Sequence, residues 1–178
     1  MIGDLVSLSA RAVRDLLKDR QVTPLELLDA LEARISEVNE PVNALPTLCF
    51  ERARARAREQ DFCTLPLAGI PIAIKDLLTV SGVRTTFGSM AYRDHVPKAS
   101  DLLVERIEAA GGIVYAKSNT PEFGAGANTF NDVFGFTRNP WNTALSAAGS
   151  SGGSAVALAT GMAWLATGSD LGGSLRNP

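Results

Sequence analysis

Residues 148–154 read Ala-Gly-Ser-Ser-Gly-Gly-Ser, and residues 168–176 read Gly-Ser-Asp-Leu-Gly-Gly-Ser-Leu-Arg. Between these two loops, the apolar residues predict a short helix over 154–160 and a short strand over 162–167. Glycine lets a backbone adopt positive φ and approach other groups closely, at an entropic cost to folding. Because the chain accepts that cost twice, beside several hydroxyl groups, the loops predict a functional site rather than simple turns.

The composition is typical of a globular protein, with 178 residues, 46% hydrophobic residues and a net charge of −2. Such a charge argues against a nucleic-acid-binding surface. The two cysteines, Cys49 and Cys63, lack a metal-binding spacing and fit a reducing compartment. The charged N-terminus, from Asp4 to Lys18, does not resemble a signal peptide, and the most apolar run, 155–166, is too short to cross a bilayer. We therefore expect a cytoplasmic protein without a membrane partner.

The N-terminal third of the chain predicts helices. Ser9 can cap a helix over 8–17, and residues 23–26, Thr-Pro-Leu-Glu, form a capping box with a first-turn proline. The helix that this box begins should end at Pro41, and a further helix is expected over 51–60. The apolar stripe of the proline-started helix consists of Leu28, Leu31, Ile35 and Val38.

The middle of the chain predicts a strand, a helix and a second strand. Residues 69–74 and 113–116 are short apolar runs, and a helix begins between them at residue 100 or 101. This order predicts an α/β fold with a mixed, largely parallel central sheet covered by helices. Residues 118–145 are expected to form a long loop, which in a compact domain is usually functional. The predicted buried face of the central helix consists of Leu103, Ile107 and Ala110.

Three polar residues stand at the ends of these apolar elements. Lys75 follows the first strand, Ser150 precedes a helix, and Ser174 follows the last strand. Ligands collect outside the carboxyl ends of parallel strands, where Lys75 and Ser174 would lie. Serine needs a neighbouring base, and the only histidine, His95, lies in a polar loop, where we assign it no role. A serine–lysine arrangement is therefore favoured over a Ser-His-Asp triad, provided that burial lowers the pKa of the lysine.

The second loop also offers successive backbone N–H groups, from Leu171 to Ser174, that could bind the oxyanion of a tetrahedral intermediate. A phosphate site is the alternative, but neither loop has the Gly-Lys-Ser/Thr ending of a phosphate-binding loop. Without a wider pattern, a surface lysine and turn serines are the ordinary interpretation. Four phenylalanines are expected in the core rather than in an acyl pocket: Phe123, Phe130, Phe134 and Phe136.

Several blocks together resemble the amidase signature family, in family order from about Leu67 to the last residue. These blocks are residues 69–76, 121–124, 138–141, 149–154 and 168–176. The resemblance implies a Ser–Ser–Lys triad in which Ser174 is the nucleophile that forms an acyl-enzyme, Ser150 relays protons, and Lys75 is the base. It also implies a cis peptide bond before Ser150. An oxyanion hole is implied at Leu171, Gly172 and Gly173, and supporting polar roles that hold the two loops together at Ser151, Asp170 and Arg176.

The activity that the resemblance implies is hydrolysis of a small-molecule carboxylic amide to acid and amine, without metal or organic cofactor. One alternative is the amide-transferring, glutaminase subunit of a tRNA-dependent amidotransferase, which would have partner subunits; a simple amidase could instead be a homodimer. The non-enzyme alternative is an inactive truncated scaffold with an exposed hydrophobic surface.

Two departures from the family pattern matter. The family has Pro-Gly-Gly before the paired serines, whereas residues 147–149 read Ala-Ala-Gly, and alanine restricts the loop if position 148 needs positive φ. The family domain also continues well beyond the nucleophile. We therefore expect residues 1–178 to be the N-terminal part of one domain, with a helical region over 1–66 and a catalytic signature region over 67–178.

Overall fold

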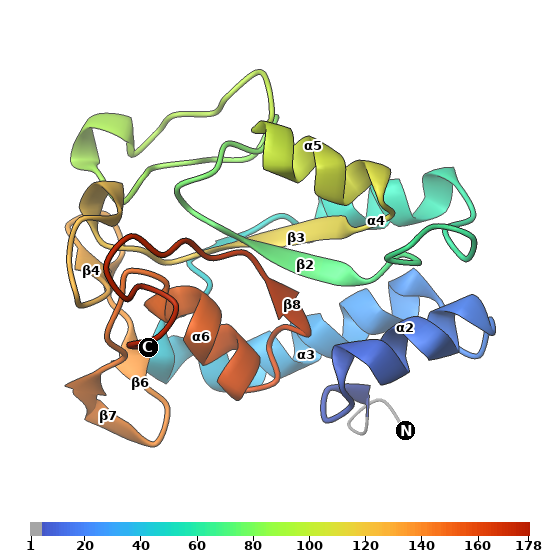
Figure 1. Ribbon diagram of the computed structural model, residues 1–178, viewed down its shortest axis with the longest axis horizontal. Helices are drawn as coiled ribbons and strands as arrows, with labels where there is room; N and C mark the ends of the chain where they lie inside the picture. The colour runs from blue at the N-terminus through green and yellow to red at the C-terminus, as the bar shows by residue number, and fades with distance from the viewer. Residues whose placement is uncertain (1–4) are drawn as a thin grey trace.

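A mixed four-stranded sheet forms the centre of the computed structural model, which describes residues 5–178 (Figure 1). The sheet order is β1-β3-β2-β8, with β3 and β8 parallel to β2 and β1 antiparallel to β3. The predicted α/β class with a largely parallel sheet is therefore confirmed; Asp4 of the N-terminal prediction lies outside the described residues. The strands are β1 (Thr47–Leu48), β2 (Pro71–Lys75), β3 (Ile113–Ser118) and β8 (Leu165–Ala166).

Helices cover both faces of this sheet. In Figure 1, α2, α3 and α6 lie on one side and α5 on the other. Helix α4 lies at the β3 side, where ion pairs join Arg54 to Asp29 of α3 and Arg52 to Glu108 of α5. None of the helices within residues 5–178 combines the length and the apolar character needed to span a membrane. The helices are α2 (Ala10–Lys18), α3 (Pro24–Val42), α4 (Phe50–Glu59), α5 (Leu102–Ala109), α6 (Gly152–Ala159) and the short 3-10 turns η1 (Met90–Tyr92) and η2 (Glu122–Gly124).

The first two helices begin where their capping residues predict. The Ser9 hydroxyl accepts a hydrogen bond at the start of α2, and Thr23 and Glu26 form the full capping box of α3. Helix α3 runs one residue past Pro41, because the left-handed residue Asn43, with φ of 50°, ends it. Asparagine tolerates this conformation better than most residues, so the stop follows from local chemistry.

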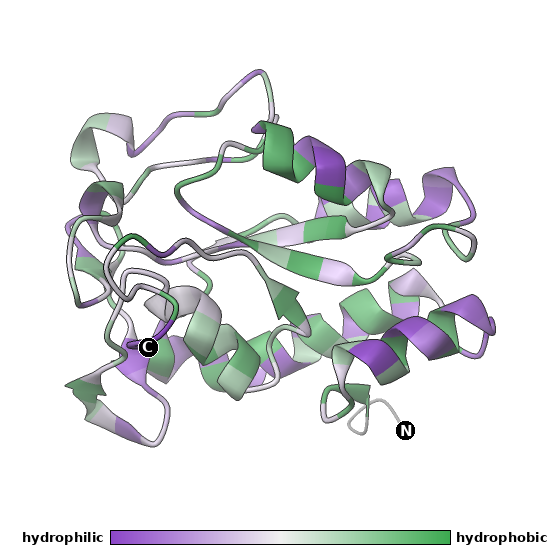
Figure 2. Ribbon diagram, viewed as in Figure 1, coloured by the Kyte–Doolittle hydropathy of each residue, from purple (hydrophilic) through white to green (hydrophobic). Residues whose placement is uncertain are grey.

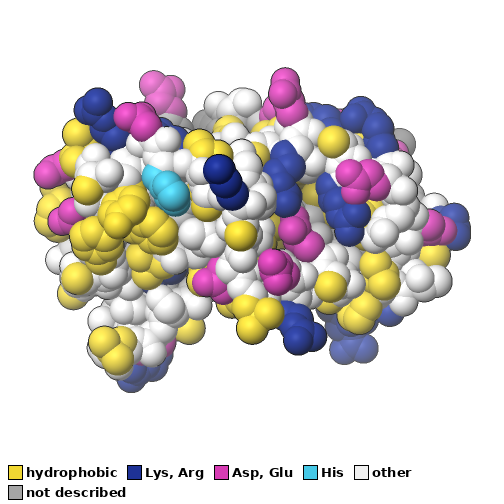
Figure 3. Space-filling view, turned by 90° about the horizontal axis from the view of Figure 1, so that it is seen from above, with side chains coloured by type: hydrophobic (Ala, Val, Ile, Leu, Met, Phe, Trp, Pro, Cys, Tyr) yellow, Lys and Arg dark blue, Asp and Glu magenta, His cyan; other side chains and the backbone are white. Residues whose placement is uncertain are grey.

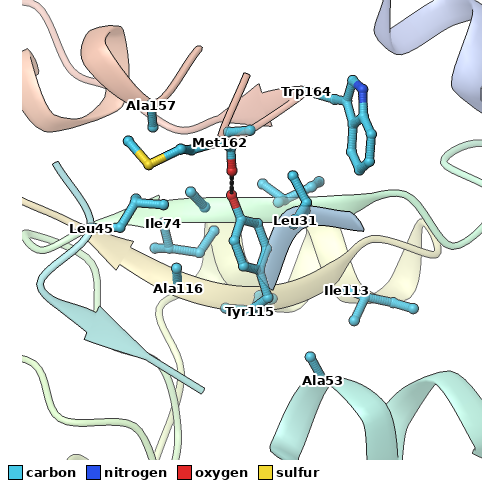
Figure 4. Close-up of a cluster of buried hydrophobic side chains, with 14 of the residues drawn as sticks. Leu31, Leu45, Ala53, Ile74, Ile113, Tyr115, Ala116, Ala157, Met162 and Trp164 are labelled. Atoms are coloured by element: carbon cyan, nitrogen blue, oxygen red, sulfur yellow. Dashed lines mark hydrogen bonds between the residues drawn. The ribbon is translucent and has the colours of Figure 1, made fainter. Parts of the chain in front are cut away.

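The hydrophobic core lies between the sheet and the inward faces of the helices, where Figure 2 shows hydrophobic residues gathered. At its centre the buried Tyr115 hydroxyl of β3 donates a hydrogen bond to the main-chain carbonyl of Met162 (Figure 4). The Met162 N–H donates a hydrogen bond to the carbonyl of Ala157 in α6. Because these groups are bonded elsewhere, the predicted strand over 162–167 is confined to two residues, Leu165 and Ala166.

The predicted buried face of α5 is partly wrong. Leu103 is 47% exposed, whereas its neighbour Val104 is fully buried and Ile107 is partly buried. Successive residues of a helix point about 100° apart, so assigning Leu103 instead of the adjacent Val104 to the buried face rotates that face by the same angle.

The long segment after β3 is also more ordered than expected. It forms two small antiparallel hairpins, β4 (Phe130–Asn131) with β5 (Gly135–Phe136) and β6 (Arg138–Asn139) with β7 (Asn142–Ser146). The expectation that its phenylalanines lie in the core is wrong for three of the four: the rings of Phe130 and Phe136 stack on each other at the surface, and Phe123 is exposed. Phe134 is half-buried. A hairpin with two-residue strands has too little area to bury both faces of its aromatic side chains.

Helix α6 begins with glycines because it approaches other backbone closely. A Cβ atom at Gly153 would lie 2.4 Å from the main-chain nitrogen of Asn119, 2.6 Å from its carbonyl oxygen, and 2.8 Å from the carbonyl oxygen of Ala44. These atoms belong to backbone and cannot rotate away. The approach sets the start of α6 against the end of β3.

We predict that Gly153→Ala lowers the free energy of unfolding by about 3 kcal/mol, the upper end of the range for overpacking, because rigid backbone surrounds the site. The matched control is Ala159→Ser, at an exposed position of the same helix, which should cost about 0.5 kcal/mol. Urea denaturation of both variants measures the difference, and equal losses would contradict the packing interpretation.

Candidate functional site

Lys75 ends β2 as a buried amine surrounded by hydroxyl groups. The side chain is 1% exposed, and its Nζ donates hydrogen bonds to the Oγ atoms of Ser150 at 2.8 Å, Ser151 at 2.9 Å and Ser169 at 2.9 Å. The main-chain N–H of Lys75 donates to the Thr167 hydroxyl at 2.8 Å. Three chain segments therefore converge on one amine.

No carboxylate contacts this amine among the described residues. Burial lowers the pKa of Lys75 to about 8, and the negative charge of Asp170 acts more weakly in the opposite direction. With that pKa, roughly a tenth of the lysine is neutral at pH 7. A neutral amine can accept a proton from one of the three hydroxyls that it touches, so the site can act as a general base.

The loop that carries Ser150 is held by Thr129. The Gly149–Ser150 peptide bond is cis, as the sequence resemblance implies. The carbonyl of Ala148 accepts hydrogen bonds from the main-chain N–H and the hydroxyl of Thr129, at 2.9 and 2.8 Å. The same hydroxyl accepts from the N–H of Gly152 at 3.1 Å. Thr129 thus braces the loop on both sides of Ser150.

Ser174 lies next to this loop but does not contact the amine. Its main-chain carbonyl accepts a hydrogen bond from the N–H of Ser151 at 3.3 Å, and its side chain is half-buried. The hydroxyl of Ser174 makes no hydrogen bond to any residue in 5–178. The structure therefore brings Lys75 and Ser150 into direct contact and holds Ser174 beside them through the backbone.

Asp170 organises the second loop internally. Its carboxylate accepts hydrogen bonds from the N–H groups of Gly173 at 2.7 Å and Leu175 at 3.1 Å, and from the Arg176 guanidinium at 3.0 Å through two nitrogens. These hydrogen bonds, first that of Arg176, hold the pKa of the Asp170 carboxyl well below its ordinary value. Asp170 and Arg176 stabilise their own loop, while Ser151 supplies the contact between the two loops.

The same hydrogen bonds bear on the predicted oxyanion hole. The Gly173 N–H is occupied by Asp170, so in this conformation it is not available to an oxyanion. The N–H groups of Leu171, Gly172 and Ser174 donate no hydrogen bond within the described part of the chain. Leu171 is fully exposed. The donors that remain for a substrate oxygen are these three.

A cavity of about 360 Å³ is lined largely by residues that flank Thr129 in the sequence. The cavity lies beside the Ser150 loop. Asn128, one of its lining residues, is so close to that loop that a Cβ at Gly149 would lie 3.1 Å from the Asn128 carbonyl carbon. Concave sites with apolar walls and a few polar groups are the usual form of small-molecule pockets. Its walls include Met90, Pro121, Glu122, Asn128, Phe130 and Asp132.

An exposed aromatic cluster borders this cavity. His95, for which the sequence predicts no role, stacks on Phe87 and meets the edge of Tyr92, whose ring also contacts Phe123. Figure 3 shows hydrophobic side chains gathered around this histidine on the surface. Tyr92 and Phe123 are 41% and 57% exposed, so the cluster presents apolar surface to solvent next to the cavity.

Sequence reasoning missed three hydroxyl residues that build the site. Ser169 contacts the amine, Thr167 binds the Lys75 main chain, and Thr129 braces the Ser150 loop. Ser169 lies inside the second glycine- and serine-rich loop, so its position was the only indication in the sequence. Thr167 and Thr129 carry no pattern that distinguishes them from other threonines.

The fold and this cluster define an α/β protein with a serine–lysine site. The amidase family profile matches residues 26–178. The chain is 43% identical to a glutamyl-tRNA(Gln) amidotransferase subunit of Roseiflexus sp. (strain RS-1), over 98% of this chain and 37% of that protein. The chain thus belongs to the amidase family, known as the amidase signature family, and spans little more than a third of the length of the curated relatives it matches.

Solved structures agree with this assignment. 6-Aminohexanoate cyclic dimer hydrolase is 34% identical, with a TM-score of 0.88 over 95% of this chain and 35% of that one. A bacterial aryl acylamidase of the amidase signature family is 30% identical, with a TM-score of 0.87 over 95% of this chain and 36% of that one.

Ala148 occupies a backbone conformation that suits glycine. Its φ is 56°, so the position where the family has glycine does require positive φ. Left-handed backbone costs a non-glycine residue about 1–2 kcal/mol, and the extra entropy of glycine in the unfolded chain offsets about half of this.

We predict that Ala148→Gly raises the free energy of unfolding by about 0.5–1 kcal/mol. Ala147→Gly is the matched control; this neighbour is buried and has no positive φ, so glycine there should destabilise by about 1 kcal/mol. Chemical denaturation of the two variants checks the opposite signs, and loss of stability in both would show that Ala148 is not strained.

Proposed function

We propose that this chain carries the reacting groups of an amidase, which hydrolyses a carboxylic amide to acid and amine through an acyl-enzyme on Ser174. The observation that carries the proposal is the buried Lys75 amine, without a carboxylate partner, in direct contact with the Ser150 hydroxyl. Such an amine loses its proton close to neutral pH and can therefore take one from a neighbouring hydroxyl.

In the proposed mechanism, the Ser174 hydroxyl oxygen attacks the amide carbon as its proton passes to Ser150 and the Ser150 proton passes to Lys75. The N–H groups of Leu171, Gly172 and Ser174 stabilise the oxyanion. The proton held by Lys75 then returns through Ser150 to the leaving amine, and the carbon–nitrogen bond breaks. Water attacks the acyl-enzyme by the same relay, which regenerates Ser174 and releases the acid.

The families of the relatives support this activity. Two of the matching structures are named as a cyclic dimer hydrolase and an aryl acylamidase. The proposed substrate is a small-molecule amide, and the cavity beside the Ser150 loop, with its mixed apolar and polar walls, is the proposed pocket for it. A cytoplasmic location is part of the same proposal, in keeping with the free thiols Cys49 and Cys63.

A single domain is also proposed for the helical region over 1–66 and the signature region over 67–178. Helix α3 of the first region packs in the same hydrophobic core as the sheet, with Leu31 and Tyr115 both fully buried. The Arg34 guanidinium of α3 donates to the carbonyl of Thr160 after α6, at 2.8 Å. Elements that share one core fold as one unit.

The second proposed function is the amide-transferring subunit of a tRNA-dependent amidotransferase. It is favoured by the 43% identity to a protein named as a subunit of such an enzyme. Such a subunit would act with partner subunits and release ammonia from glutamine. Glutaminase activity together with co-purifying subunits would select this function, whereas hydrolysis of simple amides by the protein alone would select the amidase.

We predict that a fluorophosphonate probe acylates the complete protein at Ser174. Ser174→Ala should reduce labelling at least 100-fold, because in the proposed mechanism the Ser174 oxygen is the atom that the probe acylates. The matched control is Ser36→Ala, at an exposed serine of α3, which should label like the parent. Mass spectrometry locates the adduct, and full labelling of the Ser174 variant would exclude it as the nucleophile.

We predict that the rate of this acylation rises with pH through a midpoint of about 8. The lysine is protonated below its pKa and cannot accept a proton, whereas above it the neutral base predominates. Lys75→Met should lower the rate about 100-fold or more and abolish its rise with pH around 8. Lys98→Met, at an exposed lysine, is the control and should keep the parent profile; a Lys75→Met variant with the parent profile would refute the base assignment.

A further inference from the structure

A second lysine is buried at the same end of the sheet. Lys117 of β3 is 0% exposed, and its Nζ donates to Asp76 Oδ1, to the Leu78 carbonyl and to the Thr85 hydroxyl, each at 2.8 Å. The other carboxylate oxygen of Asp76 accepts hydrogen bonds from the N–H and the hydroxyl of Thr86, at 3.0 and 2.6 Å. Both charges are therefore fully hydrogen-bonded.

The two lysines point to opposite faces of the sheet. Lys75 lies opposite Ser118 in the parallel β2–β3 ladder, and Lys117 lies opposite Ile74. Because adjacent residues of a strand alternate between faces, Lys75 points toward α6 and Lys117 away from it. Asp76, the next residue after Lys75, is bonded to Lys117 and so lies on the second face.

We propose that the Lys117–Asp76 ion pair is a positioning device that keeps the Lys75 amine available as a base, by holding the adjacent carboxylate on the opposite face and cancelling its charge. The proposal rests on the function proposed above, in which Lys75 is the base. Lys117 and Asp76 touch neither the substrate pocket nor the three hydroxyls, so both act through Lys75.

The charges around Lys75 explain why this pair matters. Helix α6 and strand β8 contribute no titratable side chain, and the second loop contributes Asp170, whose charge is paired with Arg176. The next residue after Lys75 is Asp76, and the neighbouring strand carries Lys117, which pairs with it. An uncompensated carboxylate near a lysine favours the ammonium form, and an uncompensated ammonium group disfavours it.

The pKa directions agree with this geometry. Burial lowers the pKa of both lysines; the carboxylate that acts in the opposite direction is Asp76 for Lys117 and Asp170, which makes no ion pair with the amine, for Lys75. Asp76 thus forms its ion pair with Lys117, the lysine that has no role in the proposed reaction.

The test measures the pKa of Lys75 in single and double variants, from the pH titration of its 13Cε resonance in lysine-labelled full chain, assigned with Lys75→Met. Lys117→Met leaves the Asp76 carboxylate uncompensated and should raise the pKa of Lys75 by about one. Asp76→Asn leaves the Lys117 charge uncompensated, still with an acceptor oxygen, and should lower it by about one. The double variant has neither charge and should titrate like the parent.

These opposite signs separate positioning from a merely structural role, which would change stability and leave the titration of Lys75 in place. A pKa within about 0.3 of the parent in both folded single variants, or a change in the same direction in both, overturns the proposal. If neither single variant folds, the pair is needed for the fold itself, and the proposal is overturned whatever the double variant does.

The titration does not depend on turnover, so it is distinguishable from failure of the proposed function. Acylation of Ser174 by the fluorophosphonate probe reports on that function separately. Opposite pKa changes without any acylation would retain the charge control of Lys75 and reject the amidase mechanism. Acylation with no pKa change in the variants would retain the mechanism and reject the role of the pair.

Discussion

An amine removed from water at the end of a strand, with only hydroxyl groups as neighbours, is the constraint on which this structure depends. Hydroxyls can both donate and accept, so they can satisfy either the ammonium or the neutral form of Lys75, whereas a carboxylate would fix the charge. Supplying three of them from Ser150, Ser151 and Ser169 requires two loops and the strand between them to converge. The glycines of α6 and the short β8 strand serve this convergence.

The polar groups around the site are arranged as layers that support one another. Ser154 of α6 bonds to Ser118 of β3 and to the carbonyl of Thr167, and so holds the helix against β3 and against the residue that follows β8. The Asn119 and Asn131 side chains are bonded to each other and anchor the first hairpin. A buried polar network of this kind is rigid because every broken contact would leave a desolvated group without a partner. Rigid support of this type is what a proton relay needs.

The sequence predicted what local chemistry determines. The cap at Thr23, the stop near Pro41 and the strand that ends at Lys75 follow from residue types within a few positions. The prediction for Leu103 is wrong because adjacent residues of that helical turn are equally apolar. The predicted strand at 162–167 is too long because the hydroxyl of Tyr115, far away in sequence, donates a hydrogen bond to the Met162 carbonyl. The contact between Lys75 and Ser150 was expected from the family resemblance, but Ser169, Thr167 and the Lys117–Asp76 pair become visible only once the strands are paired.

The parallel pairing of β2 with β8 has a consequence for biosynthesis. The Thr167 hydroxyl that receives the Lys75 N–H lies 92 positions later in the chain, so the ribosome delivers it long after β2 has emerged. At roughly 5–20 residues per second, the nascent strand waits on the order of 5–20 s with one edge bare. An unpaired strand edge of this kind can pair with other chains. A chaperone would therefore protect the nascent chain most during this interval.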